Sequence, residues 1–305
     1  MLQLGVIGMS SGNAHPSSWS AIINGVFDGD EISQLGFPAV ADYLAANRDT
    51  LGLPAARVTH VWAQTKDLGE HIARTAGIQQ LVTEMTDMIG KVDGVLLLRD
   101  DPENHRKIAQ PFIEAGVPIF IDKPLCSSPE DLEYFKAEVS KGKFIMSCSS
   151  MRYAGECRSV KTEMNTYGAL ELITAVGKKD WIKYGVHMLE AIFYLVDDMV
   201  PVSVTNVGKE GKDIVVIEFE SGLQAVIQLY MDIAPTFQVS VFGKDKWKLI
   251  EIRNSYAMFR DNIIEFIRSL QEGKPRLEFR KTEQIIKVVI AGHQSLQQNG
   301  RKIYL

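Results

Sequence analysis

The stretch that decides the fold runs from Gly116 to Leu125 and reads Gly-Val-Pro-Ile-Phe-Ile-Asp-Lys-Pro-Leu. Its apolar, β-branched first part, residues 116–120, is typical of a buried parallel strand. Lys123 follows at the carboxyl end, the edge at which open α/β sheets bind their ligands. Pro124 has a fixed φ and biases the lysine before it toward an extended backbone. The sequence therefore predicts a lysine that a rigid backbone directs at a ligand.

Strand and helix patterns alternate through the first 150 residues. The expected strands cover residues 2–8, 57–63, 92–98, 118–122 and 144–148, and the expected helices cover residues 16–25, 68–76, 104–115 and 129–139. Strands separated by helices of this length form βαβ units and a parallel sheet. We therefore expect residues 1–150 to form an α/β domain of the Rossmann type, a doubly wound parallel sheet that binds a dinucleotide. Residues 26–56 are too long for the usual connection and predict a helical insertion.

The second half of the chain has a different pattern. Its expected strands cover residues 170–177, 202–209, 213–220, 224–230 and 236–242, and its expected helices cover residues 184–196, 257–272 and 282–299. Runs of strands with segregated helices predict an α+β domain over residues 151–305, built on a large, mostly antiparallel open sheet. Residues 276–281 alternate like a charged edge strand.

The bulk composition excludes several classes of protein. Of the 305 residues, 46% are hydrophobic and 23% charged, which is typical of a soluble globular protein of two domains. The net charge of −5 gives no electrostatic reason to expect a nucleic acid or an anionic membrane as partner. The three cysteines lack the spacing of a metal site, so we expect no metal and reduced thiols in a cytoplasmic protein. The sequence shows no secretory signal and no apolar run long enough to span a membrane.

The turn after the first strand is a candidate phosphate loop, although the G-x-G-x-x-G fingerprint is absent from residues 8–16. Small residues let the backbone approach a pyrophosphate, and the following helix offers free N–H groups at its positive end. The candidate cofactor-binding residues here are Gly8, Ser10, Ser11, Gly12 and Asn13. A simple tight turn with a helix cap is the alternative. His15 is expected to be a local cap or packing residue.

The tip of the second main strand, residues 63–67, lacks the usual acid for the ribose of NAD. Gln64 or Thr65 can bond the ribose hydroxyls, whereas Lys66 can pair with a 2′-phosphate and favour NADP. Asp67 is either a displaced ribose acid or the cap of the next helix. The sequence therefore leaves the cofactor as NAD or NADP.

Arg99 and Asp100 follow the third main strand and are candidates for contact with the cofactor. The adjacent acids Asp100 and Asp101 would repel a pyrophosphate unless they turned outward or paired with Arg99. Residues 101–104 also make an ordinary helix start.

Residues 114–125 resemble the E-A-G-K-x-V-x-x-E-K-P-L segment of the glucose–fructose oxidoreductase/inositol dehydrogenase (Gfo/Idh/MocA) family. His105 precedes the lysine by 18 positions, as in that family. Residues 151–153 are similar to the family's R-R-F entry to the second domain, and residues 185–190 to its G-x-H-x-x-D. The final helices also fit the pattern.

The resemblance implies a Rossmann domain, then an open-faced domain over residues 151–305 that binds substrate and mediates oligomerisation, its sheet packing in homodimers or homotetramers. It implies a nicotinamide cofactor and hydride transfer to or from a hydroxyl or carbonyl of a sugar, polyol or related small molecule. In that scheme Lys123 and Pro124 lie beside the cofactor, and the lysine charge favours developing alkoxide character. His187 takes or gives the proton, and Glu190 is a candidate partner for it on the same helix face.

One departure from the family pattern bears on the chemistry. Lys183 stands four residues before His187, where the family carries a catalytic carboxylate. The lysine points away, or binds an acidic or carbonyl-rich substrate, or marks the loss of the usual chemistry. The leading hypothesis is an NAD(P)-dependent dehydrogenase or reductase acting on CH–OH groups. The alternatives are a non-catalytic cofactor-binding sensor or regulator of the same fold, and a lyase or glycosidase that recycles its cofactor.

Overall fold

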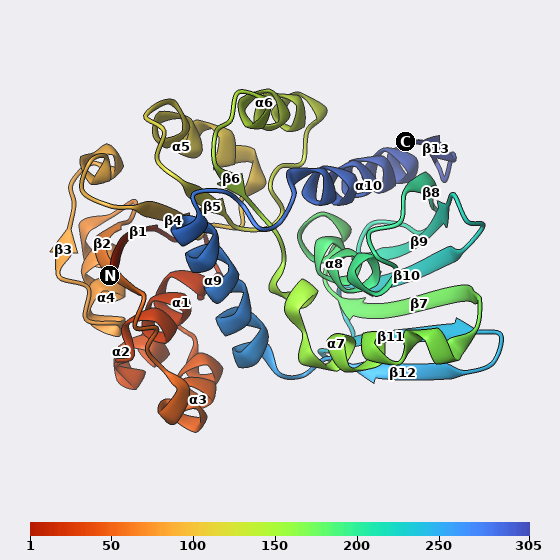
Figure 1. Ribbon diagram of the computed structural model, residues 1–305, viewed down its shortest axis with the longest axis horizontal. Coiled ribbons are helices and arrows are strands. Elements are labelled where there is room, and N and C mark those ends of the chain that lie inside the picture. The colour runs from red at the N-terminus through yellow and green to blue at the C-terminus, as the bar shows by residue number, and fades with distance from the viewer. The chain divides into compact units, whose positions relative to one another are not determined.

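The computed structural model describes residues 1–305, which form two compact units. The first comprises Met1–Cys126, Glu133–Ser147 and Phe259–Phe279, and the second comprises Ser127–Leu132, Cys148–Met258 and Arg280–Leu305. The chain therefore passes between the units several times and does not divide at a single point (Figure 1). None of its helices combines the length and apolar composition that a transmembrane span requires.

The first unit contains a parallel sheet of six strands in the order β3-β2-β1-β4-β5-β6. The strands are β1 (Leu2–Ile7), β2 (Ala56–Trp62), β3 (Gln80–Leu81), β4 (Gly94–Leu97), β5 (Ile119–Ile121) and β6 (Ile145–Met146). This order and the parallel pairing confirm the expected doubly wound sheet. The short strand β3 was not anticipated from the sequence. The strand order reverses between β1 and β4, where doubly wound sheets bind their ligands.

Helices follow the strands of this sheet: α1 (His15–Asn24), α4 (Lys66–Thr75), α5 (Pro102–Glu114) and α6 (Pro129–Ser140). A short 3-10 turn, η2 (Met85–Met88), precedes β4. Helix α9 (Ser255–Glu272) comes from the far end of the chain, yet residues 259–279 belong to this unit. Its buried Phe266 packs edge-on against Phe120 of β5, with ring centroids 5.7 Å apart. Leu270 of the same helix lies against Gly94, where a Cβ atom would come within 3.0 Å of it.

Residues 26–56 contain α2 (Gly29–Gln34), α3 (Pro38–Ala46) and a 3-10 turn, η1 (Arg48–Thr50). Asp28 begins α2 as its N-cap, because its carboxylate accepts from the backbone N–H groups of Asp30 and Glu31. The carboxylate of Glu31 then bonds the side chains of His71 and Arg74 on α4, each at 2.7 Å. The inserted helices are thereby tied to the Rossmann unit.

The second unit contains a seven-stranded sheet in the order β12-β11-β7-β10-β9-β8-β13. Only the β7/β10 pair is parallel, which confirms the mostly antiparallel sheet. The strands are β7 (Leu170–Lys178), β8 (Pro201–Asn206), β9 (Lys212–Phe219), β10 (Gln224–Tyr230), β11 (Phe237–Gly243), β12 (Trp247–Glu251) and β13 (Ile303–Tyr304). The edge strands β12 and β13 were not anticipated.

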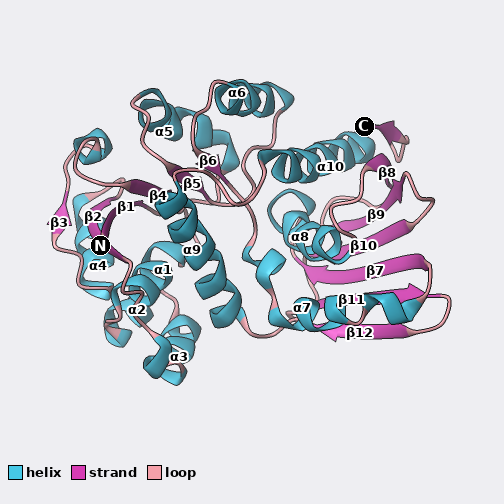
Figure 2. Cartoon of the chain, viewed as in Figure 1, coloured by secondary structure: helices cyan, strands magenta, loops and turns pink.

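Helices cover one face of this sheet (Figure 2). They are α7 (Gly155–Thr162), α8 (Val186–Leu195) and α10 (Phe279–Gln297), with short helical turns η3 (Ser150–Tyr153), η4 (Met164–Tyr167) and η5 (Trp181–Gly185), the last of π type. Trp181 packs against Gly292 and donates from Nε1 to the carbonyl of Val289, 2.8 Å away, which joins η5 to α10.

The edge strand expected over residues 276–281 is wrong, because these residues form a loop that runs into α10. Arg276 there donates to the carboxylate of Glu265 at 2.9 Å and also pairs with Glu272. These ion pairs to α9, rather than a neighbouring strand, fix the segment.

Candidate active site

A buried carboxylate at the end of β5 anchors the loop between β1 and α1. Asp122 Oδ2 accepts from Asn13 Nδ2 at 2.9 Å and lies 2.6 Å from His15 Nδ1. Burial by itself would raise the pKa of Asp122, but the charges of His15 and Lys123 and the hydrogen bonds from the loop lower it far below its ordinary value. Asn13 and His15 therefore tie the candidate phosphate loop to the strand that carries Lys123.

Lys123 lies at the carboxyl end of the parallel sheet and is only 5% exposed. Its Nζ atom is 3.7 Å from Asp100 Oδ2. The other oxygen of Asp100 accepts from Ser10 Oγ at 2.5 Å, and Ser10 Oγ in turn accepts from the backbone N–H of Asp100 at 2.9 Å. Asp100 therefore faces inward and links the lysine to the loop.

Gln64, which follows β2, and Arg99, which follows β4, bind the backbone of the same loop. Gln64 bonds both backbone groups of Met9, accepting from its N–H at 3.2 Å and donating to its carbonyl at 2.7 Å. Arg99 Nη1 donates to Gln64 Oε1 at 3.1 Å and to the Met9 carbonyl at 3.3 Å. The rest of the Arg99 guanidinium binds the carboxylate of Asp101 in a bidentate pair, at 2.9 and 2.7 Å. The polar groups of Gln64 are therefore engaged with the loop backbone.

The remaining residues of the β2 tip have local roles. Thr65 is the N-cap of α4, since its Oγ1 accepts from Leu68 N–H at 3.4 Å. The alternative of Asp67 as cap is therefore wrong, and Asp67 lies in the first turn of the helix. Lys66 is exposed, with its Nζ 3.6 Å from Glu70. Of the loop residues, Ser11 is exposed, and Gly12 adopts a positive φ of 79° in open space.

The first unit thus brings most of the predicted cofactor residues together at the carboxyl ends of β1, β2, β4 and β5 (Figure 1). Those gathered there are Gly8, Ser10, Gly12, Asn13, Gln64, Arg99, Asp100, Lys123 and Pro124. Ser11 and Thr65 lie at the rim, and both are exposed, as are Gly12 and Gln64.

The second unit carries His187, in the first turn of α8. Its Nδ1 atom lies 2.6 Å from Ser149 Oγ. Tyr184 and Phe237 pack edge-on against the imidazole ring, with centroids 5.0 and 5.9 Å away. Lys183 lies in the π-helical turn before the helix and donates its backbone N–H to the carboxylate of Asp180 at 2.9 Å. Asp180 thus caps that turn.

The expectation that Glu190 is the partner of His187 is wrong. Glu190 is buried and accepts instead from Ser149 N–H at 3.1 Å and from Arg152 Nε at 2.5 Å. Arg152 also donates to Asp198, at 2.8 and 3.2 Å. Burial alone would lower the pKa of Arg152, but the two carboxylates outweigh it and raise that pKa above its ordinary value. Although Glu190 is spaced on the helix so that it could reach His187, its carboxylate binds the guanidinium of Arg152, which is distant in sequence.

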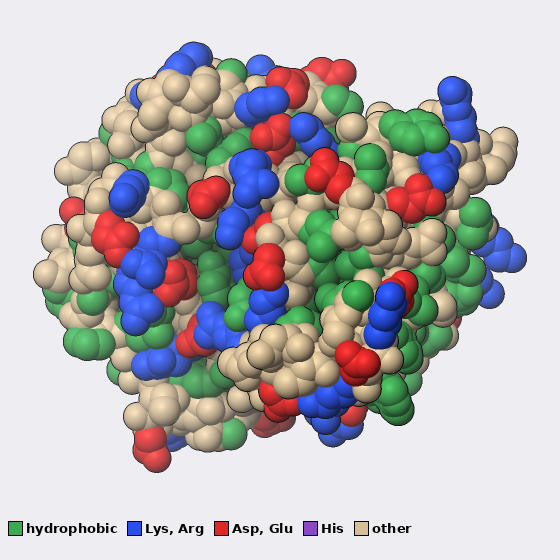
Figure 3. All heavy atoms as spheres, turned by 45° about the vertical axis from the view of Figure 1, so that its right-hand side comes forward, with side chains coloured by type: hydrophobic (Ala, Val, Ile, Leu, Met, Phe, Trp, Pro, Cys, Tyr) green, Lys and Arg blue, Asp and Glu red, His purple; other side chains and the backbone are tan.

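Ser149 is the residue that sequence reasoning missed. It lies 38 positions before His187, so no local spacing could have connected the two. No group of three or more His, Cys, Asp or Glu side chains is arranged to hold a metal ion. Figure 3 shows acidic and basic side chains interspersed over one face of the molecule rather than gathered by sign.

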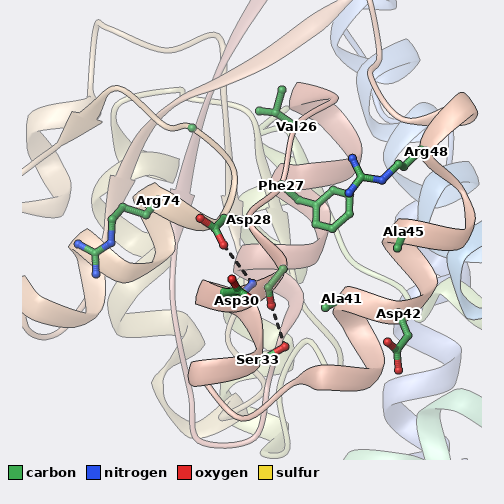
Figure 4. Close-up of a pocket in the computed structure, with 12 residues that line it drawn as sticks. Val26, Phe27, Asp28, Asp30, Ser33, Ala41, Asp42, Ala45, Arg48 and Arg74 are labelled. Atoms are coloured by element: carbon green, nitrogen blue, oxygen red, sulfur yellow. Dashed lines mark hydrogen bonds between the residues drawn. The ribbon is translucent and has the colours of Figure 1, made fainter.

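A pocket of about 660 Å³ lies away from these residues, between the inserted helices and the end of α4 (Figure 4). Arg48 stands over the ring of Phe27 there, 4.7 Å from its centroid. None of the predicted site residues lines this pocket.

Comparisons with known proteins agree with this geometry. Residues 36–148 match the family model described as an oxidoreductase family with an NAD-binding Rossmann fold. Inositol 2-dehydrogenase 1 from Saccharopolyspora erythraea is 32% identical over 107 residues, which cover 34% of this chain and 32% of that protein. The match therefore spans about a third of the length of the curated relative.

Solved structures match over nearly the whole chain. A probable dehydrogenase from Thermotoga maritima has a TM-score of 0.78 at 14% identity, covering 99% of this chain and 98% of its own. Myo-inositol dehydrogenase from Lactobacillus casei, in complex with NAD(H) and myo-inositol, has a TM-score of 0.77 at 14% identity, covering 100% of this chain and 97% of its own. These likenesses show the fold of both units.

Proposed function

We propose that the chain is a member of the Gfo/Idh/MocA oxidoreductase family and an NAD(P)-dependent dehydrogenase or reductase acting on a CH–OH or carbonyl group, since residues 36–148 match the model of that oxidoreductase family. The observation that carries this proposal is Lys123, a buried cation at the carboxyl edge of the Rossmann sheet, joined through Asp100 to the candidate phosphate loop. A buried lysine in a rigid polar network is suited to hold an oxygen whose negative charge grows during hydride transfer.

The residues of the first unit fit a dinucleotide. The N-cap of α1 is Ala14, whose side chain makes no capping bond, so the helix start is open to an anion. The Oγ atoms of Ser17 and Ser18 in its first turn are buried without a hydrogen-bond partner. A Cβ on Gly8 would come within 2.5 Å of Pro16, so only glycine fits this start of the loop. Gly8, Ser10, Gly12 and Asn13 would hold the pyrophosphate, with Ser11, Gln64, Thr65, Arg99, Asp100 and Pro124 around them.

The proposed roles of the side chains follow from their chemistry. The cofactor, when bound, would carry the hydride, accepting it in oxidation of a CH–OH group and giving it up in reduction of a carbonyl. Lys123 orients the substrate oxygen and stabilises developing alkoxide charge. His187 exchanges the proton, since imidazole titrates near neutral pH. Lys183 is the candidate cation for an electron-rich group of the substrate.

We place the substrate among the polyols. The Lactobacillus casei neighbour is complexed with myo-inositol, and the Saccharopolyspora relative is named an inositol 2-dehydrogenase. Inositols and related sugars are therefore the first compounds to test.

The experiment measures binding of NAD(H) and NADP(H) by calorimetry, then follows formation of reduced nicotinamide with a panel of inositols and sugars. Lys123→Ala is expected to lower kcat about 100- to 1,000-fold, the cost of removing a preorganised transition-state charge. Lys141→Ala, which removes an exposed lysine of the same unit that has no proposed contact with the cofactor, is the matched control. Full turnover by Lys123→Ala would refute the role of the lysine, and absence of cofactor binding would refute the function.

A sensor or regulator is the second candidate, and Lys183 favours it because that position carries no carboxylate. It predicts cofactor binding without turnover of any polyol. Product formation without accumulation of reduced nicotinamide would instead indicate a lyase or glycosidase that recycles its cofactor.

We also propose that the protein is a homodimer or homotetramer through the open face of its second sheet. This face carries the half-buried Leu172, Val176, Val216 and Val226. At its β12 edge Trp247 is 64% exposed and Leu249 47% exposed. Apolar area of this kind marks protein interfaces. Sedimentation should detect an oligomer that Val226→Glu dissociates, and a monomeric wild type would exclude it.

The cysteines support a cytoplasmic location as part of this proposal. Cys126, Cys148 and Cys157 are all free and buried. Free thiols are the rule in a reducing compartment.

A further inference from the structure

We propose that Asp100 determines which oxidation state of the cofactor the protein binds: its carboxylate balances the charge of Lys123, so that the positively charged ring of NAD⁺ or NADP⁺ can bind next to a lysine. This inference rests on the proposed function, which makes Lys123 the residue that orients the reacting oxygen. The sequence did not show which way the acid would turn, and the structure turns it inward, with the residue 9% exposed.

The carboxylate of Asp100 is fixed on both sides. Its Oδ1 atom accepts from Ser10 Oγ at 2.5 Å, and the backbone N–H of Asp100 donates to the same hydroxyl at 2.9 Å. Its Oδ2 atom lies 3.7 Å from Lys123 Nζ. The two side chains of this pair are 13% and 6% exposed. Because water is largely excluded, the two charges act on each other and on a bound group more strongly than they would at the surface.

The two other acids at this edge of the sheet are held in other places. Asp101 forms a bidentate pair with the guanidinium of Arg99, at 2.9 and 2.7 Å. Asp122 anchors the candidate phosphate loop and accepts from the backbone N–H of Lys123 at 2.8 Å. Asp100 is therefore the acid whose side chain joins the loop to the lysine ammonium.

The oxidised and reduced forms of a nicotinamide cofactor differ by one charge at the reacting ring. The ring is positive in NAD⁺ and NADP⁺ and neutral in NADH and NADPH. Lys123 orients the oxygen of the reacting group in the proposed function, so its ammonium must be close to this ring and would repel the oxidised form. The Asp100 carboxylate offsets that repulsion, because it lies beside the ammonium and has the opposite charge. Oxidation of a CH–OH group needs the oxidised form, so the ion pair favours that direction.

The test compares the dissociation constants of NAD⁺ and NADH by calorimetry, or of NADP⁺ and NADPH if the phosphorylated pair binds more tightly. The two forms differ chiefly in the charge of the ring. A variant that merely damages the phosphate loop therefore weakens both forms and leaves the ratio of their dissociation constants unchanged. The ratio separates a charge effect from a structural role.

Asp100→Asn keeps the size of the side chain and an oxygen that can accept from Ser10. It should weaken the oxidised form relative to the reduced form by at least about tenfold, because opposite unit charges in an effective dielectric constant of about 20 attract by more than this factor out to about 10 Å. Asp100→Ser removes the same charge with a smaller side chain, and it takes the place of Asp100→Asn if that variant does not fold.

Three variants complete the design. Asp100→Glu keeps the charge, so it should keep the wild-type ratio even if both forms bind more weakly. Lys123→Met removes the cation and leaves the carboxylate, so it should shift the ratio in the opposite direction, toward the oxidised form. Asp49→Asn removes an exposed acid of the same unit and should leave the ratio unchanged.

The outcomes separate this inference from the proposed function. A folded Asp100→Asn or Asp100→Ser protein with the wild-type ratio would overturn the inference, and so would an Asp100→Glu protein with the ratio of the neutral variants. These results would leave the proposed function standing, because the cofactor would still bind. A wild-type protein that binds neither form of either cofactor would refute the proposed function, and the inference with it.

Discussion

The Asp122 carboxylate ties the candidate phosphate loop to the parallel sheet, and Asp122→Asn tests how much it contributes. The residue is 1% exposed, and its Oδ2 accepts from Asn13 at 2.9 Å and lies 2.6 Å from His15. Its Oδ1 accepts from the backbone N–H of Lys123 at 2.8 Å. Asparagine keeps the volume and one oxygen, but it removes the charge and places an NH₂ group against Asn13 and His15.

The expected loss in free energy of unfolding is about 3–5 kcal/mol. Two hydrogen bonds to a charged acceptor contribute about 1.5–3 kcal/mol each. Breaking a buried charge pair on one side costs about 3–5 kcal/mol, which agrees with that sum. Because a domain is stable by only about 5–15 kcal/mol, the change should be plain in urea unfolding near neutral pH.

The pH dependence of this difference follows from the lowered pKa of Asp122. The carboxyl has an ordinary pKa of 3.8, and in the folded protein its pKa is lower. Its ionisation therefore stabilises the fold fully above the unfolded pKa and loses that effect as the pH falls below it. The gap between wild type and Asp122→Asn should be present at pH 5 and shrink below about pH 4.

Urea titrations of both proteins across this range measure the gap. Asp49→Asn, at an exposed aspartate of the same unit, is the control and should change stability by less than about 0.5 kcal/mol. A loss below about 1 kcal/mol for Asp122→Asn, or a gap that stays constant at acid pH, would refute the reasoning.

Two further substitutions and one labelling experiment also have defined outcomes. Glu190→Ala should lower the free energy of unfolding by about 3–5 kcal/mol in urea titration, because it leaves the buried Arg152 short of a counter-charge; a loss within about 0.5 kcal/mol would contradict this. Native protein should resist thiol reagents near neutral pH, since burial raises the pKa of Cys157 to about 12 and the other two cysteines are also buried; rapid labelling before unfolding would count against it. Gln64→Ala should raise the Kd for the dinucleotide about tenfold in calorimetry while sparing the fold, because the side chain holds Met9 of the loop on both backbone groups; an unaltered Kd would show that the loop needs no such support.

Apolar runs in the sequence correctly predicted the buried strands of the first sheet. The continuous apolar runs at Leu4–Ile7, Val95–Leu98 and Ile119–Ile121 are buried and form neighbouring strands of the parallel sheet. Strand β12 was missed because four of its five residues are exposed, so it lacks the alternation of a half-buried strand.

The sequence did not predict which distant side chains would contact one another. The apolar stripe of α9 predicts a buried face but not the surface that buries it, and in the structure that surface includes Phe120 and Gly94 of the first unit. Glu190 has the helical spacing of a partner for His187, yet Arg152, from another segment, takes its carboxylate. Spacing identifies which side chains can meet within a helix, and it cannot rank them against a buried charge from elsewhere.

The unusual phosphate loop shows how side chains can replace a glycine fingerprint. Gly8 and Gly12 remain where backbone must approach closely or turn with positive φ. The other positions are polar, and each of the side chains of Ser10 and Asn13 reaches a carboxylate at the end of a different strand, Asp100 after β4 and Asp122 after β5. The loop is thus shaped by bonds to its neighbours rather than by backbone freedom. Asp122 precedes Lys123 in the sequence and accepts from its backbone N–H, and Asp100 lies beside the lysine ammonium. The two carboxylates that shape the loop therefore also fix the lysine.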